Sequence, residues 1–338
     1  KMSRTFSYLL TLSNSRDLHP IIDEQDRRQF GKRLPNSLTQ ILVALEPFKK
    51  NLEAVVVEST YNWYWLVDGL QEEGYKVHLA NPSAIKQYEG LKHTDDKWDS
   101  FWLAHMKRLN ILPEGYIYPK EERPVRDILR RRLLFVQQRT AQILSLQSAI
   151  SRNLSLRMSG NAIKKLKEED TEDLFDSPFL VLTAKSNIAV IQFLTKRITA
   201  IENAVKSHAK LREEFQLLKT IPGIGNILAL TIMLEVGDIG RFPKVGNYSS
   251  YCRCVKSEKI SNKKKKGENN RKNGNKYLSW AYVEAANFAI RFSPEAQKFY
   301  QRKMAKTDKI VAIKALGNKL ARASYYIMRD RVAYDPSK

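Results

Sequence analysis

The sequence predicts an α/β domain followed by two mainly helical parts, and three observations support this fold class. Residues 1–122 alternate short apolar strands with amphipathic helices, a pattern typical of a mixed sheet with helices on its faces. Residues 123–215 contain two long helical runs with few glycines and prolines, which predict an antiparallel helical arm or coiled coil. Residues 216–338 place further helices on either side of a basic segment, which predicts a mainly helical C-terminal domain.

The first part contains its strands and helices in the order expected for such a sheet. Three short strands come first, in TFSYLLTL, HPIIDE and RRQFGKRLP. NSLTQILVALEPFKKN has apolar residues at helical spacing after an Asn-Ser start signal. The continuous β-branched run LEAVVVES predicts a buried strand. A helix in NWYWLVDGLQEEG ends at Gly74, a strand in YKVHLANP is stopped by Pro82, and DDKWDSFWLAHMKRLN predicts another helix.

The rest of the chain is mostly helical. The two long runs of the arm are PVRDILRRRLLFVQQRTAQILSLQSAISRNLS and SNIAVIQFLTKRITAIENAVKSHAKLREEFQLLKTI. The acidic stretch KEEDTEDLFDSP between them predicts a loop or a short helix. In the third part, YLSWAYVEAANFAIRF and DKIVAIKALGNKLARASYYIMRD predict helices that follow the basic segment.

The composition indicates a basic protein with a polyanionic partner. The 338 residues carry a net charge of +22, and the isoelectric point is about 9.8. Such an imbalance causes self-repulsion that a bound nucleic acid would neutralise; a generally basic protein with another function is the alternative. No apolar run approaches the roughly 20 residues of a membrane-spanning helix, and we expect no signal peptide. We therefore expect nucleic acid rather than a membrane as the partner, and a cytoplasmic, nucleoid-associated location.

The cysteines and histidines argue against a disulfide or a zinc site. Cys252 and Cys254 are separated by one residue, a poor spacing for a disulfide, and no second Cys or His pair completes a zinc site. The chain therefore predicts a reduced protein. Any catalytic metal is expected to have oxygen ligands, which favours Mg²⁺ or Mn²⁺.

The turn in IPGIGNILAL resembles a helix-hairpin-helix turn. Gly223 and Gly225 would let the backbone approach a phosphate, and the N-terminus of the following helix supplies N–H donors that lack a partner within the helix. The alternative is an ordinary turn whose glycines serve the packing of the helices.

The basic segment, residues 256–276, contains nine Lys or Arg and two Glu. Such a loop gains affinity for a phosphate backbone by releasing counterions, although a solvated surface loop is the alternative. Ser261 precedes four lysines by two residues, and nearby cations would stabilise a developing alkoxide or a charged phosphorane. The candidate phosphate-binding residues of the segment are Lys263, Lys264, Lys265, Lys266, Arg271 and Lys272.

Three carboxylates of the first part are candidate metal ligands. Glu58 ends the strand AVVVE, and open sheets place their chemistry at the carboxyl ends of buried strands. Asp96 and Asp99 are three residues apart in a predicted helix, so they share a face and repel each other unless a cation shields them. The alternative is that both only stabilise the N-terminus of that helix through its dipole.

Arginines gather at the start of the arm. Together with Arg123 and Arg132, they predict a basic helical surface for RNA or DNA phosphates, and the candidates are Arg126, Arg130 and Arg131. The alternative is a helix face that is only solvated while the neighbouring leucines pack.

These motifs together resemble the Piv/DEDD-type transposases of bacterial insertion sequences. The resemblance rests on VVVESTYNWYWLVDGL, HLANPSAIKQYEGLKHTDDKWDSFWLAHM, SNKKKKGENNRKNGNKYLSWAYVEAANFA and the TIPGIG turn. They occur in the order of the family and extend over nearly the whole chain, to about Arg329. The resemblance implies a RuvC-like, ribonuclease-H-type domain in residues 1–122, a coiled-coil arm in 123–215 and a C-terminal transposase domain with a catalytic serine in 216–338.

The resemblance also implies site residues, a cofactor and partners. Glu58, Asp96 and Asp99 match three of the family's four acidic positions, and Ser261 matches its serine. The implied activity is RNA-guided cleavage and exchange of DNA strands through a covalent phosphoserine, with Mg²⁺ or Mn²⁺ on the carboxylates. The implied partners are donor and target DNA, a non-coding bridge RNA and further copies of the chain in a dimer or tetramer.

One position departs from the family pattern. The first strand of the family normally ends in Gly-Ile-Asp, whose Asp is the first metal ligand, and Thr11 stands at that position. A threonine hydroxyl is neutral and a weak ligand, so either the activity of this copy is altered or three carboxylates suffice. Two alternatives stay open: a RuvC-like, structure-selective nuclease that has no use for Ser261, and an inactive transposase remnant that only binds nucleic acid.

Overall fold

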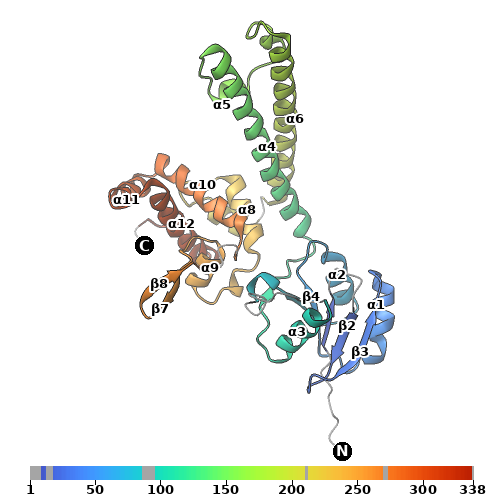
Figure 1. The fold of residues 1–338 in the computed structure, drawn as a ribbon. Helices are drawn as coiled ribbons and strands as arrows, with labels where there is room; N and C mark the ends of the chain where they lie inside the picture. Colours follow the sequence, from blue (N-terminus) through green and yellow to red (C-terminus); the bar gives the residue numbers. More distant parts are fainter. Residues whose placement is uncertain (1–8, 13–17, 86–95, 210–211, 269–272, 337–338) are drawn as a thin grey trace, which may run out of the picture. The chain divides into compact units, whose positions relative to one another are not determined.

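The structure is a computed structural model that describes residues 9–12, 18–85, 96–209, 212–268 and 273–336 (Figure 1). The chain divides into two compact units, Lys1–Lys120 and Glu121–Lys338. Separate hydrophobic cores lie within the two units.

The first unit contains a six-stranded mixed sheet in the order β3-β2-β1-β4-β5-β6. Its strands are β1 (Leu9–Leu12), β2 (Leu18–Ile22), β3 (Arg28–Arg33), β4 (Ala54–Glu58), β5 (Val77–Ala80) and β6 (Glu114–Gly115). β1, β4 and β5 are parallel to one another, whereas β2, β3 and β6 run antiparallel to the strands they pair with. The predicted mixed sheet is confirmed, including its three early strands.

Helices pack on both faces of this sheet because the side chains of β4 alternate. The helices are α1 (Leu38–Leu45), α2 (Tyr64–Glu72) and α3 (Asp96–Arg108). Val55 and Val57 pack into a core with α1 and α2, and Ala54 and Val56 pack into a second core with α3. All four side chains are at most 2% exposed. Burial on both faces explains why this strand reads as a continuous apolar run.

The second unit begins with two long helices, α4 (Arg123–Leu154) and α6 (Pro178–Ala209), which lie side by side (Figure 1). They are antiparallel, because Arg132 contacts Glu202, and Arg139, one heptad further along α4, contacts Thr195, one heptad earlier in α6. The connection between them contains α5 (Gly160–Ile163). The two long antiparallel helices agree with the prediction of an arm, and their supercoiling stays a prediction.

Helix α6 is apolar beyond the surface that faces α4. Ile188 and Ile191 are buried in the core of the arm, whereas Phe179 and Phe193 are 81% and 56% exposed. Pro178–Ser207 has the length and the mean hydropathy of a membrane-spanning helix, and 28% of its most apolar window is buried. The expectation that no apolar run approaches that length is therefore wrong for α6. Core helices meet the same criterion, so it does not establish a membrane span.

The remaining helices of this unit pack around one core. They are α7 (Glu213–Leu218), α8 (Asn226–Val236), α9 (Val245–Tyr251), α10 (Lys276–Phe292), α11 (Pro294–Met304) and α12 (Lys309–Asp330). Helix α8 is the most enclosed, with every residue from Leu228 to Val236 buried. Leu129 of α4 and Val205 of α6 belong to the same core. The arm and the bundle are therefore one compact unit, and their division into two domains stays a prediction.

A small hairpin, residues 259–267, lies where the sequence predicts a basic loop; we call it the serine hairpin. Its strands β7 (Lys259–Ser261) and β8 (Lys264–Gly267) pair antiparallel, with Ser261 opposite Lys264. The two residues between them, Asn262 and Lys263, have φ values of 50° and 60°. Two consecutive residues with positive φ fit a type I′ hairpin turn. The expectation of a loop is therefore wrong for this part of the basic segment.

Candidate functional site

The first candidate residue, Glu58, lies at the carboxyl end of β4. Alternation along the strand places it on the same face as Ala54 and Val56, which pack with α3. The parallel strand β5 ends at the same edge, where Ala80 lies opposite Glu58. Glu58 therefore lies at the carboxyl edge of the sheet, on the face that α3 covers.

The contacts of the last turn of α3 define the direction of this helix. Arg108 donates from Nε to Oδ1 of Asp26 at 2.7 Å and from Nη2 to Oδ2 at 2.5 Å, and Nδ1 of His105 lies 2.9 Å from Oδ1. Burial raises the pKa of Asp26, but the hydrogen bonds from Arg108 and His105 outweigh this effect and hold the pKa below its usual value. Asp26 lies in the turn from β2 to β3, at the edge of the sheet opposite to Glu58.

Helix α3 therefore begins at the edge where β4 ends. Its 13 residues extend about 20 Å, comparable with about 17 Å for the five residues of β4. Asp96 is the first residue of the helix, and its side chain lies outside the described part. Asp99 is four residues ahead of Leu103, which is 2% exposed in the core between α3 and the sheet. Asp99 therefore lies on the stripe of α3 that faces the sheet.

The structure thus brings Glu58 and Asp99 to one edge and one face of the sheet, where α3 starts with Asp96. Carboxylate oxygens of this kind fit Mg²⁺ or Mn²⁺. Among the side chains that the structure describes, no group of three His, Cys, Asp or Glu residues is arranged to hold a metal ion, so Asp96 would have to complete the set. Thr11 lies opposite Val56 on β1, close to the same edge, and its side chain is also outside the described part.

In the second unit, Ser261 is exposed next to the turn of the serine hairpin. Residues directly opposite each other in an antiparallel pair lie on the same face, with Cβ atoms about 5 Å apart. Lys264 therefore lies on the same face of the hairpin as Ser261. Lys263 lies in the turn, and Lys266 lies where the register of the hairpin shifts; Lys263, Lys264 and Lys266 are all exposed. The side chain of Lys265 and the whole of Arg271 and Lys272 are outside the described residues.

Hydrogen bonds to backbone carbonyl groups hold the two ends of the segment that carries the serine hairpin. Nε of Arg253 donates to the carbonyl oxygens of Asn273 and Gly274, both at 3.1 Å. The N–H of Asn275 donates to the carbonyl oxygen of Tyr251 at 2.6 Å, and its side chain caps α10. Gly274 has a φ of 87°, and a Cβ there would overlap the backbone of Tyr251. These contacts attach the base of the hairpin segment to α9 and α10.

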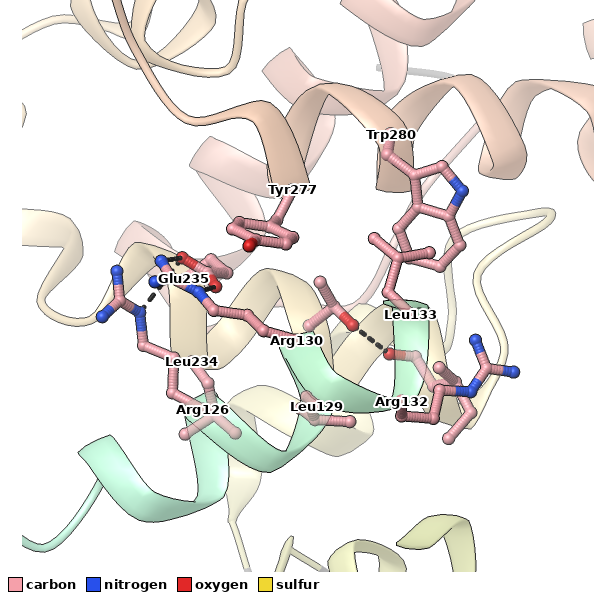
Figure 2. Close-up of a pocket in the computed structure, with 11 residues that line it drawn as sticks. Arg126, Leu129, Arg130, Arg132, Leu133, Leu234, Glu235, Tyr277 and Trp280 are labelled. Atoms are coloured by element: carbon pink, nitrogen blue, oxygen red, sulfur yellow. Dashed lines mark hydrogen bonds and ion pairs between the residues drawn. The ribbon is translucent and has the colours of Figure 1, made fainter. Parts of the chain in front are cut away.

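A buried carboxylate, Glu235 of α8, connects the arm to the start of α10, and Figure 2 shows its contacts with the arm. Arg126 donates from Nε to Oε2 at 3.1 Å, and Arg130 donates from Nε to Oε1 at 2.5 Å and from Nη2 to Oε2 at 2.8 Å. Nδ2 of Asn275 donates to Oε2 at 2.7 Å. Burial raises the pKa of Glu235, but the hydrogen bond from Arg130 and the charges of both arginines outweigh this effect and hold the pKa below its usual value. Glu235 is therefore a buried ion balanced by two cations.

This pairing changes the predicted basic surface of the arm. Arg126 is 7% exposed and directs its Nε to Glu235, and Arg130 also stacks over Tyr277, 4.4 Å from the ring centroid. Arg131 is exposed, so of the three candidates it presents its charge most openly. Phosphate binding by the three stays a prediction, against which the burial of Arg126 counts. The sequence analysis did not predict a role for Glu235. One feature of the sequence could have indicated it, because Glu235 is the single charged side chain of the apolar helix α8.

The turn between α7 and α8 requires a glycine at position 223 but not at position 225. Gly223 has a φ of 84°, and a Cβ there would overlap the backbone of Ala285 on α10. Gly225 has a φ of −90°, and nothing lies near the place of its missing Cβ. Gly223 therefore serves packing, as the alternative interpretation holds, and the phosphate contact of both glycines stays a prediction.

Comparisons with known proteins match both units. A family model described as transposases of the IS116/IS110/IS902 family matches residues 215–301, and a second transposase model, of the DEDD type of IS110, matches residues 19–153. The first match includes Ser261, and the second includes the three candidate carboxylates.

Two relatives extend these matches. The chain is 25% identical over 236 residues to the transposase for insertion sequence element IS1111A of Coxiella burnetii, which covers 68% of this chain and 63% of that protein. It is 22% identical over 176 residues to an uncharacterized 43.6 kDa protein of insertion element IS110 from Streptomyces coelicolor, covering 49% of this chain and 44% of that protein. The chain therefore spans less than two thirds of the length of these relatives.

Proposed function

We propose that this chain, which belongs to the IS110 family of transposases, cuts and rejoins DNA strands through a covalent bond to Ser261. The observation that carries the proposal is the exposed Ser261 opposite Lys264 on a hairpin rich in lysine. A solvated loop would need no such pairing, whereas a nucleophile benefits from a cation at a fixed position. The net charge of +22 supports a polyanionic substrate.

The proposed step transfers one phosphoryl group without a high-energy cofactor. The Oγ atom of Ser261 attacks the phosphorus of a DNA phosphodiester, the Oγ–P bond forms, and the bond from phosphorus to a deoxyribose oxygen breaks. The serine loses its proton, and the departing deoxyribose oxygen gains one as it becomes a hydroxyl. A deoxyribose hydroxyl of the exchanged strand then attacks the phosphoserine and restores Ser261. Because each step exchanges one phosphate ester for another, the bond energy is conserved.

Lys264 has the position expected of a residue that assists this step. Its ammonium group, on the same face of the hairpin as Ser261, would favour the serine alkoxide and the extra negative charge on phosphorus. Lys263 and Lys266, which are also exposed, would hold the neighbouring phosphates of the strand. The hydrogen bonds of Arg253 and Asn275 at the base of the segment would limit the motion of the serine hairpin.

We propose a metal site at the carboxyl edge of the sheet in the first unit, which we interpret as a RuvC-like domain. Glu58, Asp96 and Asp99 would hold Mg²⁺ or Mn²⁺ there, because hard cations prefer carboxylate oxygens. A metal held there would polarise a phosphoryl oxygen of the DNA. Thr11 at the fourth position supplies a neutral hydroxyl in place of a charge, so we expect weaker metal binding than with four carboxylates.

We further propose that the protein works as an oligomer with DNA and a bridge RNA that selects donor and target sequences. The exposed cation Arg131 on the arm and the lysines of the serine hairpin offer charge for both nucleic acids. The exposed stripe of α6, which includes Phe179, Leu182, Val190 and Phe193, supports self-association, because large apolar side chains repeat at heptad-like spacing on a helix face that α4 leaves uncovered.

The decisive experiment compares Ser261→Ala with Ser257→Ala, a matched serine change in the same segment. The purified proteins are incubated with Mg²⁺ and DNA carrying the ends of the insertion element, and products are separated on denaturing gels. We expect a covalent protein–DNA adduct with the wild type and with Ser257→Ala, and none with Ser261→Ala. Normal recombination by Ser261→Ala would refute the assignment of the nucleophile.

The same gel separates the proposal from a structure-selective nuclease. Cleaved DNA without an adduct, unaffected by Ser261→Ala, would indicate hydrolysis by water at the carboxylates alone. Sequencing of the nucleic acid that copurifies with the protein tests the guide. A discrete non-coding RNA from the element is expected, and random cellular RNA would contradict that part of the proposal.

A further inference from the structure

A groove of about 560 Å³ lies between α4 and the first turns of α10 in the second unit. This volume lies within the range of roughly 300–1,000 Å³ that is usual for sites of small organic ligands. Leu133 and Leu134 line it from α4, and Tyr277 and Trp280 line it from α10. The groove is distinct from Ser261 and from the candidate carboxylates, none of which lines it.

Trp280 gives this groove a partly exposed aromatic side chain. Part of the side chain packs against the core of the second unit, and among the described residues no other aromatic ring or cation stacks on it. Figure 2 shows Trp280 on α10 and Leu133 on α4, and both residues line the groove. The Tyr277 ring differs, because the guanidinium of Arg130 stacks on it at 4.4 Å and Lys276 Nζ lies 5.2 Å from its centroid. Trp280 is therefore the ring that a flat ligand would meet.

The charges around the groove favour an anion. Arg131 and Lys276 line it as cations, Asp127 lines it as a carboxylate, and the charge of Arg130, which also lines it, is offset by Glu235. Glu235 does not line this groove and is balanced by Arg126 and Arg130. An aromatic platform beside exposed cations is the combination with which proteins bind single-stranded nucleic acid, because every base has a face to stack and a phosphate nearby. A duplex does not fit, because its bases are already stacked on one another.

We propose that this groove binds an unpaired nucleotide, with its base stacked on Trp280 and its phosphate held by Arg131 and Lys276. The side-chain amide of Gln137, which also lines the groove, can donate to and accept from a base edge. The inference rests on the proposed function, because it assumes that the protein handles DNA or RNA with unpaired segments. DNA and RNA share this chemistry, so the test includes both.

The test measures binding of fluorescently labelled dT12, rU12 and a 12-base-pair duplex by anisotropy over a series of salt concentrations. Loss of one stacked base costs about 1–3 kcal/mol, so Trp280→Ala should weaken binding of the single strands about 5- to 150-fold. The salt dependence should stay unchanged, because no charge is lost. Arg131→Gln and Lys276→Gln should each reduce the salt slope by about 0.7 for single strands. If Trp280→Ala weakens binding of dT12 more than binding of rU12, the bound nucleotide belongs to DNA. The opposite order assigns it to RNA.

Two control variants distinguish stacking from a general loss of structure. Phe288→Ala removes a 41% exposed ring from the same helix outside the groove and should leave binding unchanged. Trp280→Phe keeps a ring and should restore most of the affinity. Because Trp280→Ala could also perturb folding, wild-type protein is crosslinked to an oligonucleotide containing 4-thiothymidine. We expect the crosslink in the tryptic peptide 277–291.

The outcomes separate this inference from the proposed function. If the wild type binds neither single strands nor duplex, the proposed function fails together with the inference. If the wild type binds single strands and Trp280→Ala binds them equally well, or if the crosslink lies only in other peptides, the inference alone is wrong. A change in self-association with unchanged nucleic-acid binding would assign the groove to a protein interface instead.

Discussion

Removal of the charge of Glu235 should destabilise the second unit more than any exposed charge change on the arm. Glu235→Gln keeps the size of the side chain but leaves Arg126 and Arg130 without their shared counter-charge. The carboxylate side chain is 3% exposed, and those of Arg126 and Arg130 are 8% and 27% exposed. Breaking a buried ion pair typically costs about 3–5 kcal/mol. Because Arg130 remains partly accessible to water, we expect the lower end, about 3 kcal/mol.

The assay is urea unfolding followed by hydrogen exchange and mass spectrometry, which reports each unit through its own peptides. With a urea dependence of roughly 2 kcal/mol per M, the loss shifts the midpoint of peptides from α8 and α10 down by about 1.5 M. Peptides from the sheet of the first unit serve as an internal control and should not shift. Glu202→Gln is the matched variant, because Glu202 pairs with Arg132 while its side chain is 32% exposed. This pair is more accessible than Glu235 and its arginines, so its loss should cost less, closer to the value of about 0–1 kcal/mol for surface pairs.

The pH dependence gives a second readout of the same ion. The pKa of folded Glu235 lies below its usual value, so the unfolded chain binds the proton more readily. The stabilisation is therefore fully present above the unfolded pKa, near 4.5, and is lost as the pH falls through the folded pKa. Glu235→Gln should remove this part of the pH dependence. A midpoint shift below about 0.3 M, or an acid slope equal to that of the wild type, would refute the reasoning.

Three further predictions follow from other parts of the chain. Gly223→Ala should lower the free energy of unfolding by about 2–4 kcal/mol, because the added methyl group would overlap the backbone of Ala285 and φ is positive. Gly225→Ala, the control, should lower it by less than about 0.5 kcal/mol. Chemical denaturation measures both values. Thr11→Asp should strengthen Mg²⁺ or Mn²⁺ binding in calorimetry and raise metal-dependent cleavage, and no gain would mean that position 11 is not a ligand. Phe193→Glu should shift the protein toward smaller species in analytical ultracentrifugation, because a charge replaces a 56% exposed ring of the α6 stripe.

The sheet and the long helices could be predicted because their signals are local. The continuous β-branched run of β4 predicts a strand, whichever strands pair with it. Burial on both faces of the sheet requires this apolar composition. The prediction that Glu58 lies at a carboxyl edge required only the end of that run. Its place on the face of α3 required the alternation of β4 and the contact of Arg108 with Asp26, which lie 82 residues apart in sequence.

The structural use of the arginines could not be predicted, because their partner is distant in sequence. Arg126 and Glu235 are separated by 109 residues, and the helix periodicity of the arm does not indicate which face meets α8. The same pattern of arginines in the sequence is therefore expected for a helix that binds phosphate and for one that neutralises a buried carboxylate. The serine hairpin was missed for a different reason. Its turn, Asn262 and Lys263, lacks the glycine that usually marks a type I′ turn, and its strands are lysine-rich rather than apolar.

Asn275 connects the two structural features that the sequence did not predict. Its side chain donates to Glu235 and caps α10, and its N–H bonds to Tyr251 at the base of the segment that carries the serine hairpin. The same residue therefore contacts the ion pair at the base of the arm and one end of the hairpin segment. A displacement of α4 relative to α8 would change the hydrogen bonds available to Asn275 and, through them, the start of α10. The arm and the candidate nucleophile thus share one buried polar support within a single compact unit.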